Sequence, residues 1–411
     1  MSDVIIVGAG PAGSVLAALL AQRSIDTLLL DKATFPRPKT CGDYLSPGTV
    51  HLLDRLDLLQ MVRAGDPRRL SGMTVVSPDG TTFTAAYPAP AGTEAPRPYA
   101  LSIPRATLDD ALLNHARGWG VKCLEGFQVT ELAREDGSVC GVRGIGPQGP
   151  EAYRSRIVVG ADGRNSVVAR RLDLFRPHPR LRRMALVAYY EGAPSLEDCG
   201  LICSGDRSYC ILNPVCESVI NASIVLDQPV IHAWKGRLED LFDGTLVGFP
   251  RAATALAAMR RAGPVRCLGP LAYRARRTAG PGALLIGDAA GFYDPFTGEG
   301  VFHALQSAER AAHLIAGLLT SGDPAPPLLA RFDRRQRKTL AARERLGAAL
   351  QAIIRRPAIA NAFARLLLGR PALADLLMGV IGDLLPPRAL LSTNMLKRLL
   401  KESIHRTDDS R

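Results

Sequence analysis

Three closely spaced glycines near the N-terminus, followed by an aspartate, have the types and spacing that bind a dinucleotide. The glycines are Gly8, Gly10 and Gly13, and the acid is Asp31. The first glycine allows a sharp turn, the second lets backbone N–H groups approach a pyrophosphate, and the third lets a helix pack closely on a strand. The carboxylate of Asp31 is placed to bind both hydroxyls of an adenosine ribose. These residues predict a dinucleotide site.

The elements around this motif must be a strand, a helix and a second strand. β-branched residues fill 4–7, an Ala- and Leu-rich segment covers 14–22, and a second apolar run ends at Asp31. This is a βαβ unit whose helix N-terminus faces the phosphates. A second GxGxxG sequence, at 144–149, also follows a strand-like run, but no helix follows it. We predict that it forms the tip of a β-hairpin.

Two further aspartates follow apolar runs later in the chain. Asp162 lies in a tight acidic turn after 157–159, and Asp288 ends the buried run 283–287. Ligands of open α/β folds bind at the carboxyl edge of the sheet, and a carboxylate placed there needs hydroxyl partners. Asp288 is therefore expected to bind a ligand.

Cys41 lies in a loop, 35–47, that is too rich in proline and glycine to be a simple connector. Its thiol has either a chemical role or a packing role in this loop. Four other cysteines, between 199 and 216, lie in strand-like sequence and are predicted to be buried free thiols. The chain lacks paired CxxC motifs and an HExxH motif, so no metal site is predicted.

The composition is that of a globular protein, and 411 residues are enough for two domains. The formal charge of +12 comes from arginines scattered along the chain, so no nucleic-acid binding is expected. No apolar run reaches the ~18 residues that a membrane-spanning helix needs. No signal peptide precedes the first strand, and we expect a cytoplasmic protein.

Three motifs in this order resemble the FAD-dependent oxidoreductases of the p-hydroxybenzoate hydroxylase and geranylgeranyl reductase superfamily, which also includes flavin-dependent halogenases. They are the glycine motif with Asp31, the pair Asp162-Gly163, and the pair Gly287-Asp288 followed by Pro295-x-x-Gly298-x-Gly300. The resemblance covers residues 1–320. It implies noncovalently bound FAD, with NAD(P)H as a transient reductant. The cofactor-binding residues that it implies are Gly8, Gly10, Ala12, Gly13, Asp31, Lys32, Cys41, Gly42, Arg105, Asp162, Gly163, Gly287, Asp288, Pro295, Gly298 and Gly300.

The resemblance also implies roles for individual residues. In this family the acid of the second motif touches the flavin pyrophosphate region and the nicotinamide nucleotide, and the acid of the third holds the ribityl chain. Gly298 and Gly300 open a helix whose unpaired N–H groups stabilise negative charge on reduced flavin, so they are expected to be catalytic together with Cys41. Arg105 matches a flavin-contacting arginine; the alternative is a solvated residue at the start of a helix.

The order of strand-like and helical sequence predicts an α/β fold. We expect a Rossmann-type FAD-binding domain with an inserted mixed α/β substrate domain and a C-terminal helical segment. Helices are expected at 48–62, 108–119, 234–241, 252–261 and 301–319. The FAD-binding domain is assigned to 1–70, 99–180 and 265–327, the substrate domain to 71–98 and 181–264, and the C-terminal helical region to 328–411.

The loop around Cys41 most resembles the geranylgeranyl reductase branch, in which the cysteine lies over the flavin. The substrate-cavity motif of that branch, Tyr-x-Trp-x-Phe-Pro, keeps only Tyr209 and Pro214 here. The halogenase motif Trp-x-Trp-x-Ile-Pro is absent, and the only tryptophans are Trp119 and Trp234, so halogenation is not expected.

Three functions remain open. The departure from the cavity motif favours a monooxygenase, which uses NAD(P)H and a flavin C4a-hydroperoxide to hydroxylate a largely apolar aromatic or polyketide-like substrate. The second is a reductase that delivers hydride from flavin N5 to a carbon–carbon double bond of an isoprenoid, with Cys41 near the reacting carbon. The third is a non-catalytic flavoprotein or a membrane-surface scaffold.

The C-terminal region is expected to cap the cavity of a small hydrophobic substrate. A basic stripe near its start is followed by apolar helical segments at 363–368 and 376–381. Two interpretations stay open: packing on the two domains, which is favoured, and peripheral contact with an anionic membrane. The basic residues are Arg331, Arg334, Arg335, Arg337 and Lys338.

Overall fold

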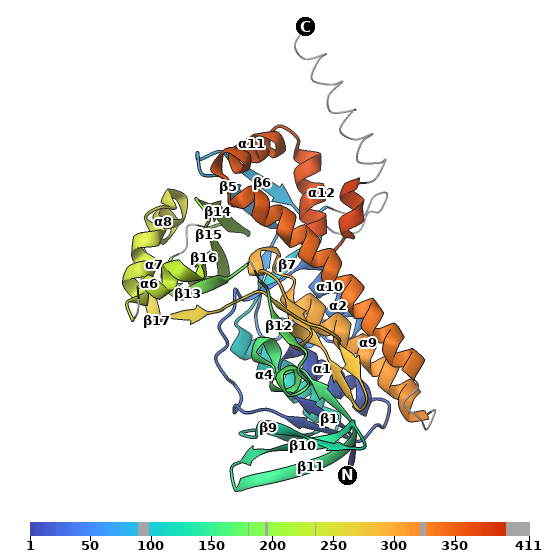
Figure 1. Cartoon of the computed structure of the whole chain (residues 1–411). Coiled ribbons are helices and arrows are strands. Elements are labelled where there is room, and N and C mark those ends of the chain that lie inside the picture. The colour runs from blue at the N-terminus through green and yellow to red at the C-terminus, as the bar shows by residue number, and fades with distance from the viewer. Residues whose placement is uncertain (89–97, 180, 194–195, 235, 321–325, 392–411) are drawn as a thin grey trace.

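The computed structural model describes residues 1–88, 98–179, 181–193, 196–234, 236–320 and 326–391. Two larger β-sheets form its two lobes, and a long helix, α10 (Pro326–Ile354), runs along both of them (Figure 1). The fold is α/β with a Rossmann-like parallel core, and the predicted fold class is confirmed.

The sheet near the N-terminus has a parallel centre. Its strands and covering helices are β1 (Ser2–Val7), β2 (Thr27–Leu30), β8 (Lys122–Leu124), β9 (Gln128–Glu135), β10 (Ser138–Gly146), β11 (Gly149–Gly160), β19 (Ala279–Gly280), β20 (Ala283–Leu285), α1 (Pro11–Ala21), α4 (Arg105–Gly118), α5 (Val167–Arg171) and α9 (Gly300–Thr320). The main strand order is β19-β20-β11-β1-β2-β8. In β1, Val4 and Ile6 face α1, α4 and α9, while Ile5 and Val7 face the opposite side, because a central parallel strand is covered on both faces.

The second GxGxxG sequence forms the hairpin that was predicted for it. Gly146 ends β10 and pairs with Gly149, where β11 begins. No nucleotide-binding turn forms here, because the two strands pair antiparallel directly across the glycines.

The second sheet is mostly antiparallel and joins two distant segments of the chain. Its strands and helices are β5 (Gly72–Val76), β6 (Thr82–Ala86), β13 (Arg183–Glu191), β14 (Cys199–Ser204), β15 (Tyr209–Cys216), β16 (Val219–Asp227), β17 (Arg260–Leu268), α6 (Gln228–Ala233), α7 (Leu238–Leu246) and α8 (Pro250–Leu256). The order is β17-β13-β16-β15-β14-β5-β6, and β5 pairs in parallel with β14. In β13, Leu186 and Ala188 pack towards α7 and α8, whereas Ala185 and Val187 face the other way.

Three predicted helices differ from those observed: one is divided, one begins later and one ends earlier. The helix expected at 48–62 is two helices, α2 (Pro47–Arg55) and α3 (Leu59–Arg63), because Asp57 between them adopts a left-handed backbone with φ of +57°. The helix expected at 234–241 is wrong at its start: α6 ends at Ala233 and α7 begins only at Leu238, because Gly236 has a left-handed backbone with φ of +75°. The helix expected at 252–261 ends at Leu256, because residues from Arg260 onward pair with β13 as strand β17.

The C-terminal helices close one side of the molecule. Helices α11 (Pro357–Leu368) and α12 (Pro371–Ile381) follow α10, and each has a proline in its first turn, where no backbone N–H is needed. Both contact β6 of the second sheet. The basic stripe lies exposed near the start of α10, at the opposite end of that helix from α11 (Figure 1). Within the described ranges, no helix has both the length and the apolar character needed to cross a membrane.

Short elements complete the fold. Two small sheets have the orders β3-β7-β4 and β12-β18-β21. Their strands are β3 (Tyr44–Leu45), β4 (Arg68–Leu70), β7 (Ala100–Ser102), β12 (Phe175–Pro177), β18 (Tyr273–Ala275) and β21 (Gly291–Phe292).

Candidate active site

A cavity of about 860 Å³ lies between the loops of the first sheet, the inner face of the second sheet and helices α10–α12. All the cofactor-binding residues predicted from the sequence line it, except Gly13 and Gly287. These two lie behind the wall. A Cβ on Gly13 would be 1.8 Å from the carbonyl oxygen of Gly8, and the Gly287 N–H donates to Ser307 Oγ at 2.8 Å. They serve close packing beneath the cavity.

One end of the cavity is formed by the glycine turn. Gly8 has φ of +104°, and a Cβ there would lie 2.6 Å from the carbonyl oxygen of Ala161, so only glycine fits. Among the described residues, no side chain caps the N-terminus of α1, and Ala12 in its first turn lines the cavity. The free N–H groups and the helix dipole make this end suitable for an anion such as a pyrophosphate.

Asp31 is held rigidly beside this turn. Its Oδ2 accepts a hydrogen bond from the Ala9 N–H at 2.7 Å, and its Oδ1 accepts one from the Ala33 N–H at 2.9 Å. Each oxygen keeps a further lone pair for a hydroxyl donor. Lys32 lies exposed next to it on the cavity wall.

Asp162 and Asp288 present carboxylate oxygens that lack partners. Asp162 Oδ2 accepts from the Val167 N–H at 2.6 Å, but its buried Oδ1 accepts no hydrogen bond from a described residue. The Asp288 carboxylate likewise receives none from the described part of the chain. Burial raises the pKa of both carboxyl groups, and the positive charge of nearby Lys39 lowers the pKa of Asp288. Hydroxyl groups of a bound ligand would satisfy these oxygens.

Arg105 is part of a buried charge cluster, which excludes the alternative that it is a solvated residue. Its side chain is 11% exposed, and its Nε and Nη2 bind the carboxylate of Asp109 at 2.7 and 2.9 Å. Burial lowers the pKa of Arg105, but Asp109 and Cys41 outweigh this and raise it. Its Nη1 donates to Cys41 Sγ at 3.6 Å. The thiol is therefore held at the cavity wall by a fixed cation.

Asp43 is a residue of this site that the sequence analysis did not single out. Its φ is +54°, and its Oδ2 accepts hydrogen bonds from the Tyr189 hydroxyl at 2.6 Å and from Asn221 Nδ2 at 2.8 Å. Its Oδ1 accepts from the Arg105 N–H at 3.1 Å. Burial raises the pKa of Asp43, and these hydrogen bonds lower it. The signal in the sequence was an acid directly after Cys41-Gly42.

Two asparagines from the second sheet fix the loop around Cys41. Asn221 Nδ2 also donates to the carbonyl oxygen of Cys41 at 2.7 Å, and Asn213 Nδ2 donates to that of Gly42 at 3.0 Å. The loop from the first lobe is thereby tied to strands β15 and β16. Cys41 lies at the junction of the two lobes.

The predicted glycines before α9 form a tight turn on the same cavity. Gly298 has φ of +65°, and a Cβ there would lie 2.5 Å from the Tyr44 ring. Gly300 begins α9, so its N-terminal N–H groups open towards the cavity. Between them, Glu299 accepts from Thr297 Oγ1 at 2.7 Å and is paired with Arg343 of α10.

The opposite end of the cavity is apolar. It lies between the inner face of the second sheet and the C-terminal helices, which were predicted to cap a substrate cavity. Its apolar lining includes Val75, Phe83, Ile202, Ile211, Leu350, Ile353, Phe363, Leu367, Leu377, Met378 and Ile381.

The model of the family described as "FAD binding domain" matches residues 1–219. The chain belongs to this FAD-binding family. The nucleotide end of the cavity fits the cofactor of the family: an uncapped helix N-terminus faces a place for the pyrophosphate, the buried Oδ1 of Asp162 needs a donor, and the Asp288 carboxylate is available to hydroxyl donors. The chain is an FAD-dependent oxidoreductase that binds FAD.

The relatives of this FAD-binding chain include reductases and halogenases. It is 28% identical over 345 residues to digeranylgeranylglycerophospholipid reductase 1 of Methanococcoides burtonii, covering 82% of this chain and 79% of that protein. It is 28% identical over 350 residues to menaquinone reductase of Mycolicibacterium smegmatis, covering 80% of each. Among solved structures, a flavin-dependent brominase matches with a TM-score of 0.83 at 21% identity over 99% of both chains, which shows a shared fold. A flavin-dependent halogenase matches at 25% identity and a TM-score of 0.76, over 82% of this chain and 62% of its own length.

Proposed function

We propose that this oxidoreductase reduces carbon–carbon double bonds of a large apolar substrate such as an isoprenoid chain, with NAD(P)H as the reductant. The observation that carries this proposal is the continuity of one cavity, which joins the FAD-binding end to an apolar end with Cys41 between them. Two curated relatives of similar length are named as reductases, of a digeranylgeranyl lipid and of menaquinone, and support the same reaction type.

The residues of the chain divide the work along the cavity. Bound FAD supplies the hydride chemistry. The α1 N-terminus would bind its pyrophosphate, Asp288 would accept hydrogen bonds from its ribityl hydroxyls, and the N–H groups at Gly300 would stabilise negative charge on the reduced flavin. The apolar walls orient the substrate and exclude water. Arg105 holds the Cys41 thiol where it can position the reacting carbon.

Hydroxylation by a monooxygenase is the second candidate, and one observation favours it. The segment from Tyr209 to Pro214 keeps only those two residues of the reductase cavity motif, and Ile211 and Asn213 of this segment line the cavity. A wall altered in this way fits a substrate other than a prenyl chain.

Oxygen consumption separates the two candidates. The FAD-loaded protein is supplied with NAD(P)H and an isoprenoid or an aromatic substrate, and the uptake of oxygen is compared with the oxidation of NAD(P)H. A reductase oxidises one NAD(P)H for each double bond of the isoprenoid that it reduces, whether or not oxygen is present. Substrate-dependent oxygen uptake equal to NAD(P)H oxidation would instead establish hydroxylation.

A further inference from the structure

A second, smaller cavity of about 60 Å³ lies behind the wall of the first; we call it the small chamber. It shares Asp288, Phe292, Glu299 and Gly300 with the large cavity. Two polar side chains that line it are nearly fully buried: His303 is 4% exposed and Asp294 is 7% exposed. In the part of the chain that the structure describes, neither ring nitrogen of His303 has a hydrogen-bond partner.

These unpaired atoms require polar partners inside the small chamber. Leaving a buried polar group without a hydrogen bond costs free energy. Native proteins satisfy such groups with ordered water where the site is polar and the cavity offers about 10–15 Å³ for each water molecule. Burial, with Arg343 and Arg310, lowers the pKa of His303 to about 3, so its ring is neutral, with one donor and one acceptor nitrogen. A neutral imidazole beside a carboxyl group suits water better than an anion.

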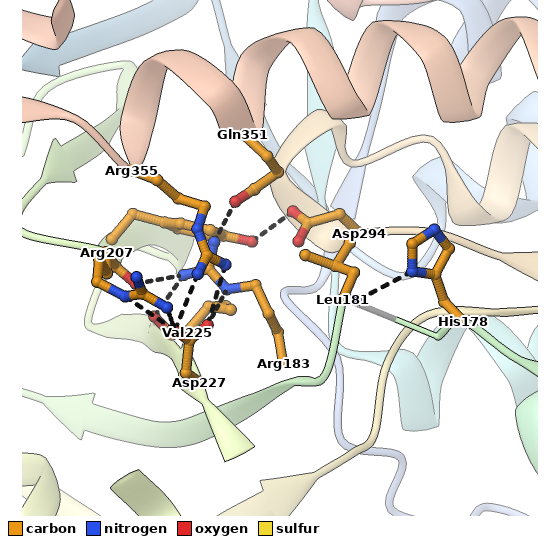
Figure 2. A network of polar contacts seen from close by, with 10 residues as sticks. His178, Leu181, Arg183, Arg207, Val225, Asp227, Asp294, Gln351 and Arg355 are labelled. Atoms are coloured by element: carbon orange, nitrogen blue, oxygen red, sulfur yellow. Dashed lines mark hydrogen bonds and ion pairs between the residues drawn. The ribbon is translucent and has the colours of Figure 1, made fainter. Parts of the chain in front are cut away.

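The small chamber is connected to the wall of the large cavity through Asp294. The Oδ1 of Asp294 accepts a hydrogen bond from the Tyr209 hydroxyl at 2.6 Å, and Tyr209 lines the large cavity. Figure 2 shows Asp294 lying between the group formed by Arg183 and Gln351 on one side and His178 on the other. Burial raises the pKa of Asp294, while Arg183 and the Tyr209 hydrogen bond lower it.

The other end of the small chamber reaches the surface. His178 and Glu344 both line it, their side chains are partly exposed, and His178 Nε2 lies 3.7 Å from a Glu344 carboxylate oxygen. Arg274, whose side chain is largely exposed, lines the same end and lies 3.7 Å from Glu344. Polar groups therefore extend from solvent to Tyr209.

We propose that the small chamber binds ordered water and carries protons from solvent to the large cavity through Asp294 and Tyr209. When a proton is consumed in the large cavity, the Tyr209 hydroxyl donates it, and the tyrosine oxygen regains a proton from the carboxylic acid form of Asp294. The carboxylate of Asp294 then takes a proton from water in the small chamber, which exchanges with solvent past His178 and Glu344. One proton moves inward, and no electrons follow this route.

This inference rests on the FAD-dependent reaction but not on the choice of substrate, because reduction of a double bond and hydroxylation both consume a proton. It can therefore be tested without any substrate. Stopped-flow reduction of bound FAD by reduced methyl viologen, which carries electrons without protons, takes up a proton, and a pH-indicator dye reports that uptake in a weakly buffered solution.

The variants Asp294→Asn and Tyr209→Phe each interrupt the route, and Tyr87→Phe is the matched control. Tyr87 is equally buried, but its hydroxyl bonds to that of Tyr44 at 2.7 Å and lies off the route. We expect proton uptake in both route variants to slow by about 10²-fold or more, the range for a lost proton-transfer group, with no change in the control. Formate added to Asp294→Ala should restore part of the rate, which a merely structural role of Asp294 would not allow.

Uptake at the wild-type rate in Asp294→Asn would overturn the inference. Should that variant fail to retain FAD, His303→Phe gives the same test, because its ring displaces water from the small chamber without touching the large cavity. An unchanged rate in His303→Phe would equally overturn it. Failure of the proposed substrate to react would leave these results unaffected, so the two proposals fail separately.

Discussion

At the scale of single residues, Asp288 is the acid whose loss should weaken FAD binding most clearly. Its carboxylate lines the cavity and receives no hydrogen bond from a described residue. Replacing it with alanine leaves the ribityl hydroxyls without their acceptor and should cost about 1.5–3 kcal/mol of binding free energy, the range for a hydrogen bond to a charged group. Calorimetric titration of the apoprotein with FAD measures this. Asp288→Asn, which keeps an acceptor oxygen, should lose less, and an unchanged FAD dissociation constant in Asp288→Ala would contradict the role.

Cys41 should affect one half-reaction and not the other. Because Arg105 holds its thiol at the junction of the FAD end and the apolar end, Cys41→Ala should slow substrate reduction and leave flavin reduction by NAD(P)H intact. Stopped-flow absorbance at the flavin band separates the two steps. If the enzyme hydroxylates instead, Cys41→Ser should keep most of the activity, and a variant normal in both steps would make the thiol a packing residue.

The sequence predicted some of these residues and not others for a physical reason. Asp31 and Asp288 could be predicted because each follows a local run of strand-forming residues. Asp43 could not, because its role depends on Tyr189 and Asn221, which are 146 and 178 residues away in the chain. Likewise Asp294 acquires its role only when β21 and α10 are brought against Tyr209.

At the scale of elements, local patterns were reliable where tertiary contacts agreed with them. The βαβ unit at the N-terminus and the hairpin at 144–149 were predicted correctly because turn glycines and apolar runs define them locally. The helix expected at 252–261 was too long, because pairing with β13 competes with helix formation from Arg260 onward. Nothing in the sequence of β5 or β14 indicates which of their residues pair, because the two strands are far apart in the chain.

The docking of the C-terminal elements should depend on pH through Asp383. This residue follows α12, and its carboxylate accepts hydrogen bonds from Ser46 Oγ at 2.7 Å and from Arg343 Nη2 at 3.1 Å. It packs closely on Gly48, because a Cβ added to that glycine would lie 2.4 Å from the Cβ of Asp383. Burial raises the pKa of Asp383 to about 7, Arg343 lowers it and Glu299 raises it. The folded state therefore holds a proton that the unfolded state releases near pH ~4, and this contribution to stability is lost as pH rises towards 7.

Asp383→Asn removes this titration while keeping the shape of the side chain. We expect the melting temperature of the variant, relative to that of the wild type, to increase between about pH 5 and about pH 8. Thermal unfolding of both proteins across this range measures the difference. A difference that does not change with pH would show that Asp383 is not protonated in the folded protein.

At the scale of the whole molecule, membrane contact should depend on α11 and not on the basic stripe. Helix α11 lines the cavity with one face, yet Ile359 and Leu368 on its outer side are 44% and 52% exposed. The basic stripe lies at the other end of α10, where it cannot support α11 directly (Figure 1). A helix that exposes Ile359 and Leu368 together with Arg356 and Arg365 fits the interface of an anionic bilayer.

Sedimentation with anionic liposomes tests this proposal. Wild-type protein should sediment with the vesicles, Ile359→Glu should reduce binding, and Arg334→Glu in the basic stripe is the matched control that should change it little. Equal binding by the wild type and Ile359→Glu would assign α11 to ordinary packing.

The reaction itself is tested most directly by following reoxidation of the reduced flavin without oxygen. The protein is reduced anaerobically with NAD(P)H, mixed with a polyisoprenoid substrate, and monitored at the flavin absorbance band while the product is analysed by mass spectrometry. We predict substrate-dependent reoxidation and a product that has gained two hydrogens at a double bond. Reduced flavin that persists until oxygen is admitted, and a product that then gains an oxygen atom, would contradict the proposed reductase.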